Sequence, residues 1–66
     1  MDDAILDKVI HYGAQRFAVC KVQFEAERNA PAERRDYLSR RLSAAYDFLT
    51  RAEELKRVEE YFRRLK

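Results

Sequence analysis

The stretch ERNAPAE at residues 27–33 decides the fold, because it separates two long segments that are suited to helices. Pro31 is the only proline in the chain. It biases Ala30 away from helical geometry and suits the first turn of a following helix. Asn29 is a residue type that can take the left-handed conformation at a helix C-terminus. We therefore predict a single break at this point.

The segments on both sides are predicted to be helices, over about residues 2–28 and about residues 31–65. The chain has 66 residues with one glycine and one proline, and 47% of them are hydrophobic and 39% charged. This composition is typical of long helices rather than of strands or disorder. The sequence predicts an all-α protein, an antiparallel two-helix hairpin that forms one domain over residues 1–66.

Apolar residues spaced by three and four positions mark one stripe along each predicted helix. The stripe residues are Leu6, Ile10, Gly13, Phe17, Cys20 and Phe24 on the first helix, and Leu38, Leu42, Ala45, Leu49 and Ala52 on the second. Folding the chain at residue 30 pairs Phe24 with Leu38, Phe17 with Ala45 and Gly13 with Leu49. Large residues then meet small ones, as in closely packed helix pairs.

A second apolar edge runs beside the main stripe of each helix. Its members are Ile5, Val9, Tyr12 and Val19 on the first helix, and Tyr37, Ala44, Phe48 and Leu55 on the second. Two helices that pack along their main stripes cannot bury both additional edges. We therefore expect these edges to be covered by another molecule.

The second helix is predicted to extend past the first, and its apolar direction shifts after Ala52. The apolar residues of this overhang are Leu55, Val58, Phe62 and Leu65. A chain this short has little stability in reserve, and it usually needs a staple such as oligomerisation. We expect the hairpin to pair with a second copy in a two-fold symmetric four-helix bundle.

No pattern in the sequence indicates catalytic chemistry, a metal or a cofactor. Cys20 is the only cysteine, so a disulfide within one chain is excluded, and its place on the main stripe favours a core role. His11 is the only histidine and lies on the opposite side of the helix from Cys20. Ser39 and Ser43 have no histidine beside them to act as a base. A single glycine cannot form a glycine-rich phosphate loop. We expect a protein that is not an enzyme.

Arg16 and Arg41 lie along the second apolar edges, where arginine and tyrosine mixed with aliphatic residues are typical of binding hot spots. We therefore predict a protein-interaction module, an inhibitor, adaptor or chaperone-like regulator that covers a surface of a larger protein. Small regulators of this kind are common in phages and mobile elements. The predicted protein-binding or dimer-interface residues are Ile5, Val9, Tyr12, Arg16, Tyr37, Arg41, Phe48, Leu55, Val58, Tyr61, Phe62 and Leu65, and Tyr46 is a further exposed candidate.

Two alternatives remain open at the level of sequence. Residues 30–66 hold ten basic and seven acidic residues, so the basic second helix would suit a dimeric RNA- or DNA-binding regulator. Its contact residues would be Arg34, Arg35, Arg40 and Arg41. A third interpretation makes the hairpin a subunit of a larger helical assembly.

The sequence also predicts a chain that stays out of membranes. No apolar run approaches the roughly 20 residues that span a bilayer. The first residues, Met1, Asp2 and Asp3, lack the basic region of a secretion signal. We expect a cytoplasmic location.

Overall fold

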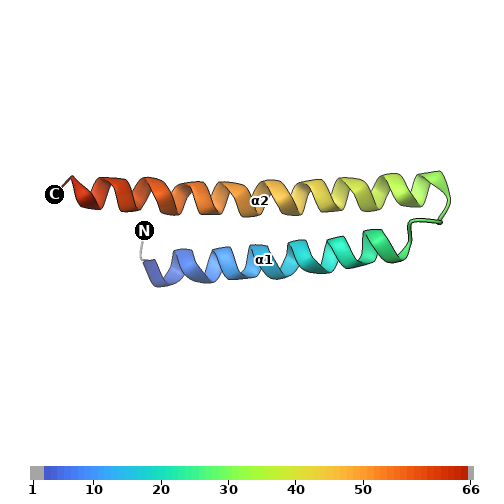
Figure 1. Cartoon of the computed structure of the whole chain (residues 1–66), viewed down its shortest axis with the longest axis horizontal. Coiled ribbons are helices and arrows are strands. Elements are labelled where there is room, and N and C mark those ends of the chain that lie inside the picture. Colours follow the sequence, from blue (N-terminus) through green and yellow to red (C-terminus); the bar gives the residue numbers. More distant parts are fainter. Residues whose placement is uncertain (1–2, 66) are drawn as a thin grey trace.

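The computed structural model describes residues 3–65, and they form two helices that lie side by side in opposite directions (Figure 1). Helix α1 spans Asp3–Ala26 and helix α2 spans Ala32–Arg64. No strand occurs among the residues that the structure describes. The predicted all-α antiparallel hairpin is confirmed.

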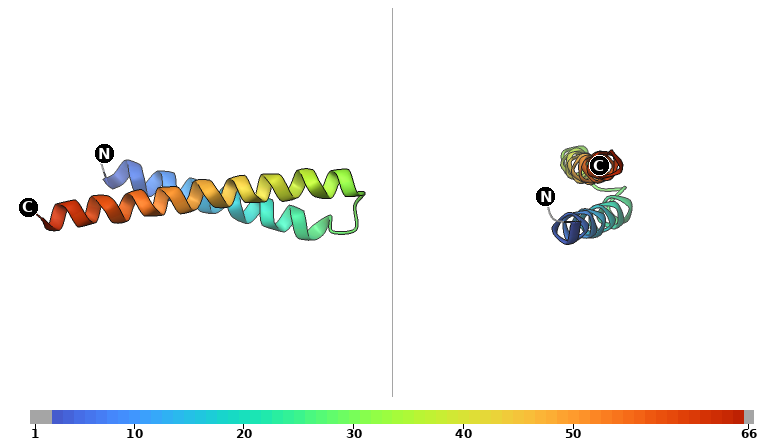
Figure 2. Two further views of the ribbon diagram at one scale, coloured as in Figure 1. Left: turned by 90° about the horizontal axis from the view of Figure 1, so that it is seen from above. Right: turned by 90° about the vertical axis from the view of Figure 1, so that its left-hand side faces the viewer.

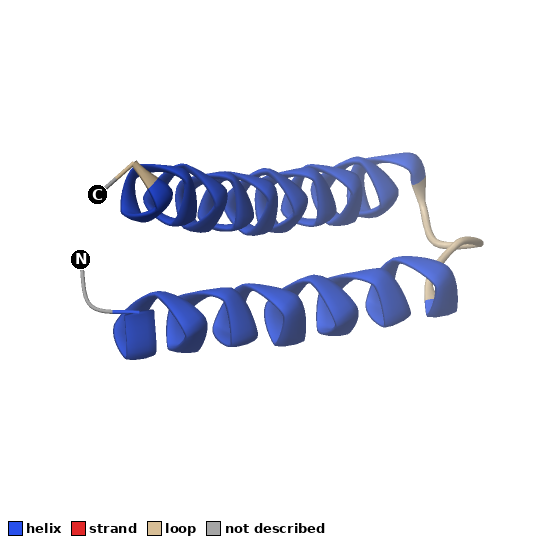
Figure 3. Cartoon of the chain, turned by 60° about the vertical axis from the view of Figure 1, so that its left-hand side comes forward, coloured by secondary structure: helices blue, strands red, loops and turns tan. Residues whose placement is uncertain are grey.

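A short turn joins the helices, and Figure 3 shows it as the only loop between them. The Ala30 N–H donates a hydrogen bond of 2.9 Å to the Glu27 carbonyl, which reverses the chain within four residues. The Arg35 N–H donates 3.0 Å to the Pro31 carbonyl as the first hydrogen bond of α2. Pro31 therefore stands immediately before α2 at the N-cap position, and its carbonyl accepts the first hydrogen bond of the helix.

The helix ends differ slightly from the prediction. Glu27 and Arg28 belong to the turn instead of to α1, and α2 begins at Ala32 and ends at Arg64. The expected left-handed Asn29 is wrong, since no residue in the described range 3–65 has a positive φ. The Glu27–Ala30 turn makes that conformation unnecessary. The predicted start at Asp2 lies outside the described residues.

The core runs along the predicted stripes. Six buried residues recur at intervals of seven on the two helices: Leu6, Gly13, Cys20, Leu38, Ala45 and Ala52. Five larger stripe residues flank them and are half-buried: Ile10, Phe17, Phe24, Leu42 and Leu49. Small residues at the centre of the seam let the helix axes approach closely. The predicted stripes are therefore the packing surfaces.

The hairpin is long and thin, and its helices cross at a shallow angle (Figure 2). It measures 54 × 15 × 13 Å, with a radius of gyration of 15.4 Å. A compact domain of this length would have a radius of gyration of about 11 Å. The accessible surface is 5416 Å², against about 4,400 Å² expected for a compact monomer of 7.9 kDa. One hairpin therefore leaves about 1,000 Å² more surface in water than a compact fold of its mass.

Helix α2 has 33 residues and α1 has 24, and the C-terminal end of α2 extends past the described part of α1 (Figure 1). Along this overhang Val58, Phe62 and Leu65 are between 43% and 65% exposed. The rings of Tyr61 and Phe62 contact each other, with centroids 5.8 Å apart. Leu55, a predicted member of this overhang, instead lies beside α1 and lines a groove with Val9. The exposed apolar end of α2 is otherwise as predicted.

Candidate interaction surface

The second apolar edges of the two helices lie on the same side of the hairpin. The Tyr12 ring meets the Phe48 ring edge-on across the seam, with centroids 6.1 Å apart and an interplanar angle of 85°. Val9 of α1 lines a groove together with Leu55 of α2. We call the resulting surface the apolar face, and it comprises Ile5, Val9, Tyr12, Val19, Tyr37, Ala44, Phe48, Leu55, Val58, Phe62 and Leu65. Two edges predicted separately thus form one continuous surface.

This face is open to solvent over its whole length. Nine of its large side chains are between 37% and 65% exposed: Ile5, Tyr12, Val19, Tyr37, Phe48, Leu55, Val58, Phe62 and Leu65. Isolated exposed apolar residues are ordinary on protein surfaces, whereas a contiguous apolar patch marks a contact site. The apolar face is therefore the candidate functional surface of the chain.

A groove of about 450 Å³ lies in the middle of the apolar face. Its apolar walls are Val9, Phe48 and Leu55, and the small residues Ala44 and Ala52 leave the space between them. Asp47 and Arg51 also line it. A hole of this kind, bordered by neighbouring turns of a helix, accepts a side chain from a facing helix.

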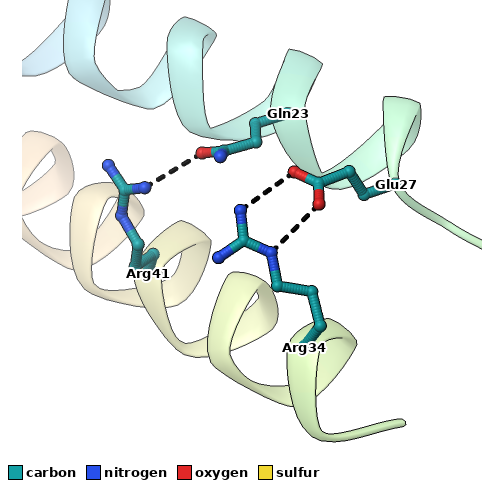
Figure 4. A network of polar contacts seen from close by, with 4 residues as sticks. All are labelled: Gln23, Glu27, Arg34 and Arg41. Atoms are coloured by element: carbon teal, nitrogen blue, oxygen red, sulfur yellow. Dashed lines mark hydrogen bonds and ion pairs between the residues drawn. The ribbon is translucent and has the colours of Figure 1, made fainter. Parts of the chain in front are cut away.

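Arginines are held in place on the turn side of the apolar face (Figure 4). Arg41 Nη1 donates a 2.9 Å hydrogen bond to Gln23 Oε1 across the seam. Arg34 donates 3.0 Å and 3.1 Å hydrogen bonds to the two carboxylate oxygens of Glu27. Both guanidinium groups lie near the Tyr37 ring, at 5.5 Å for Arg34 and 5.9 Å for Arg41. The two arginines and the tyrosine thus contact one another or residues of α1 within a single chain.

The Glu27–Arg34 pair also changes the ionisation of its two members. The hydrogen bond from Arg34 holds the pKa of Glu27 below its ordinary value, with the Arg34 charge as a further contribution. The same hydrogen bond raises the pKa of Arg34. Both groups are therefore ionised at neutral pH, and the pair closes the turn end of the hairpin.

The opposite side of the hairpin is polar. Lys56 Nζ donates a 2.6 Å hydrogen bond to Asp7 Oδ1 across the seam. A shallow hollow nearby is lined by Glu53, Arg57 and Glu60 in addition to Lys56. Two positions along an α-helix correspond to about 200°, so Glu53 and Glu60 point away from Leu55 and Phe62. The hairpin is therefore two-sided, with one apolar face and one charged face.

The four arginines predicted for nucleic-acid contact do not form one surface. Arg34 is paired with Glu27, Arg41 is bonded to Gln23, and Arg40 lies 2.9 Å from an oxygen of Asp36 in an ion pair on α2. Arg35 is exposed and points about 100° away from Arg34. Part of their charge is balanced within the chain, which weakens the case for a phosphate-binding surface.

Two of the predicted aromatic candidates fall outside the apolar face. Tyr46 packs against Phe17 on the charged side, with ring centroids 5.8 Å apart. Tyr61 stands about 100° around α2 from Phe62, so it leaves the row formed by Phe48, Leu55 and Phe62. Both are more than half exposed.

Sequence reasoning missed two residues at the turn side. Val22 is the most exposed large apolar side chain in the described range, at 67%, and it continues the surface of Val19. Its spacing of three from Val19 was a usable signal. Gln23 positions Arg41, and no feature of the sequence distinguishes it from other surface glutamines. Arg16 lines a hollow with Val19 and Arg41, and its part in a protein contact stays a prediction.

His11, Ser39 and Ser43 are exposed, and Cys20 is a free, buried thiol. Among residues 3–65, no group of three His, Cys, Asp or Glu side chains is placed to hold a metal ion. Neither described helix combines the length and the hydropathy required to cross a membrane. Comparison with family models, curated proteins and solved structures gives no match. A function for the chain is therefore argued from its apolar face.

Proposed function

We propose that this chain is a non-enzymatic protein-interaction module that binds a larger protein and covers part of its surface. The observation that carries the proposal is the single continuous apolar face, which both helices build on one side of the hairpin. Large exposed apolar patches on soluble proteins mark interaction sites. An inhibitor, an adaptor or a chaperone-like regulator would use such a face in the same way.

The turn-side half of the apolar face is the best candidate for the target protein. We define this half by Arg16, Val19, Tyr37 and Arg41. Tyrosine and arginine dominate binding hot spots, because they add apolar area and hydrogen bonds at one position. Arg41 is already held by Gln23 and Tyr37, which lowers the entropy lost on binding.

The chemistry of this half also indicates the kind of target surface. Val19 and the Tyr37 ring favour apolar side chains, and the guanidinium groups of Arg16 and Arg41 favour carboxylates nearby. A helix with an apolar stripe bordered by Asp or Glu offers both, and it can lie along the hairpin. We therefore propose an acidic amphipathic helix of a larger protein as the target.

The sequence offers a matched pair of variants to test this proposal. Tyr37 and Tyr46 are 52% and 54% exposed and lie on opposite sides of α2. We expect Tyr37→Ala to lose a protein that the wild-type chain captures from a lysate of its own cells. We expect Tyr46→Ala to keep it. Arg41→Ala and Arg40→Ala provide a second pair with the same expected contrast.

Two results would overturn the proposal. Equal capture of one protein by Tyr37→Ala and Tyr46→Ala would show that the turn-side half is not the contact. Recovery of nucleic acid alone, released as salt is raised, would favour the basic RNA- or DNA-binding regulator instead.

A further inference from the structure

We infer that a second copy of this chain covers the other half of the apolar face, running antiparallel to the first, with Phe62 of each copy in the groove of the other. We call this region the chain-end half, and it comprises Ile5, Val9, Leu55, Val58, Phe62 and Leu65. The inference rests on the proposed function for one point only, that the turn-side half is left for the larger protein. Beyond the proposed function, the inference adds that a second copy covers the chain-end half and that this copy runs antiparallel to the first.

The surface area of the hairpin fits this occupant. The whole hairpin exposes about 1,000 Å² more than a compact monomer, so burying all of this excess in two copies would remove about 2,000 Å² from water, and a contact through half of the face removes part of that area. Stable protein–protein interfaces bury about 1,200–2,000 Å² in total. The chain-end half is also the aliphatic part of the face, as expected for the core of a homodimer contact.

The distribution of charge decides the direction of the second copy. Arg16 and Arg41 line a hollow on the turn side of the apolar face, whereas the charged residues at the groove, Asp47 and Arg51, are of opposite sign. Two parallel copies would bring four arginines, Arg16 and Arg41 of each copy, together at one end, and their repulsion would oppose the contact. In an antiparallel pair the two turns lie at opposite ends. The 24 residues of α1 extend about 36 Å, several times the screening length of about 8 Å in physiological salt.

The groove decides the register. If the two-fold axis passed over the groove, the groove of one copy would lie opposite the same groove of the other copy. The two hollows would then form one unfilled void. Protein contacts avoid voids, because the atoms that line them lose their packing partners. The groove therefore needs a protruding apolar side chain from the other copy.

Phe62 is the side chain with the right position to fill it. It follows Phe48 and Leu55 at intervals of seven, so it points from the same side of α2 as the groove walls. It is 57% exposed and lies near the C-terminal end of α2. Leu55 lies about halfway along α2 between Phe62 and the middle of the groove. A two-fold axis near Leu55 therefore seats both Phe62 rings at once, as a self-complementary interface requires.

The mass of the protein in solution tests the occupant. We expect light scattering to give twice the chain mass of 7.9 kDa for the wild type at micromolar concentration. Phe62→Ala should weaken dimerisation by about tenfold or more, as loss of an interface anchor does. Tyr46→Ala is the control and should stay within about threefold of wild type, because Tyr46 is 54% exposed and lies on the charged side of the hairpin. Both Phe62 and Tyr46 are more than half exposed, so the buried residues of the hairpin core stay intact.

Cysteine cross-linking tests direction and register. In a Cys20→Ala background, Leu55→Cys should form a disulfide-linked dimer under mild oxidation, because the two Leu55 positions lie close to the two-fold axis. Val19→Cys should stay unlinked, because the turn-side halves point in opposite directions. Linking of both variants would show a parallel pair and overturn the inference. Failure of Leu55→Cys to link, or a wild-type mass near 7.9 kDa, would overturn it as well.

The two proposals can fail separately. Capture of a target is read through Tyr37→Ala, which lies outside the chain-end half. Dimerisation is read through Phe62→Ala, which lies outside the turn-side half. If the wild-type chain is monomeric and the Tyr37→Ala variant still loses the target protein, the dimer is refuted and the proposed function stands.

Discussion

The Phe48 ring lies over Gly13 at the seam between the helices. A Cβ atom placed on Gly13 would stand 3.1 Å from Phe48 Cδ1, 3.2 Å from Phe48 Cε1 and 3.4 Å from Leu49 Cδ1. Glycine inside a helix costs about 1 kcal/mol relative to alanine, and at this position it lets the Phe48 ring approach the α1 backbone closely. The same contact places Phe48 at the mouth of the groove.

We expect Gly13→Ala to raise the free energy of unfolding by less than about 1 kcal/mol. The added methyl group gains helix propensity, and it is close to a side chain that is 37% exposed and can move outward by a few tenths of an ångström. Gly13→Leu should lower stability, because a larger side chain cannot be accommodated in this way. Urea titration measures both variants. A loss of stability in Gly13→Ala would show that the Phe48 ring is fixed.

Leu38→Ala should lower the stability of the hairpin much more than a change at an exposed position. Leu38 is 2% exposed, and removal of its side chain from a buried site should cost about 2–4 kcal/mol, a large part of the stability of so small a domain. Val22→Ala is the control, because Val22 is 67% exposed and should change stability by less than about 0.5 kcal/mol. Circular dichroism during thermal unfolding compares them. Equal midpoints for the two variants would contradict the packing of the helices.

The sequence was sufficient for the fold because one signal, apolar spacing of three and four, fixes both helices and the stripes along which they pack. Pro31 placed the break correctly. The left-handed Asn29 was wrong because a turn closed by the Ala30 N–H and the Glu27 carbonyl needs no such residue. The conformational preferences of Asn29 and its neighbours do not by themselves distinguish a left-handed Asn29 from the Glu27–Ala30 turn.

The candidate site was only half predictable. The spacing showed two additional apolar edges, but the choice of a common side depends on how α1 and α2 are rotated against each other. The Tyr12–Phe48 contact supplies that information. The groove was beyond sequence reasoning, because it needs Val9 of α1 to stand beside Leu55 of α2 across the seam.

The register of the hairpin can be tested through Asp7 and Lys56, whose charged groups are 2.6 Å apart on the surface. Asp7→Lys should lower the free energy of unfolding by up to about 1 kcal/mol, since it replaces attraction by repulsion in a solvated pair. Adding Lys56→Asp should restore most of the loss. The coupling should fade as salt is raised. Additive effects of the two changes would indicate that these residues do not face each other.

Acid should weaken the turn end of the hairpin. Arg34 depresses the pKa of Glu27 in the folded chain, so Glu27 stabilises the fold above the carboxyl pKa of the unfolded chain. This contribution is lost as pH falls from about 4.3 through the lower folded value. Glu27→Gln should therefore be less stable than wild type at pH 7 and should match it at strongly acidic pH. Urea titrations at both pH values, with Glu25→Gln as control, measure the difference. A gap that stayed constant with pH would contradict the ion pair.

Chain concentration should change the thermal midpoint of the wild-type protein. When folding and dimerisation are coupled, a tenfold rise in concentration adds about 1.4 kcal/mol per dimer and raises the midpoint by several degrees. Phe62→Ala should make the midpoint much less dependent on concentration, and Tyr46→Ala should keep the wild-type slope. Differential scanning calorimetry over a hundredfold range of concentration measures the slopes. An unchanged midpoint for the wild type would mean that the hairpin core, from Leu6 to Ala52, is stable without the chain-end contact.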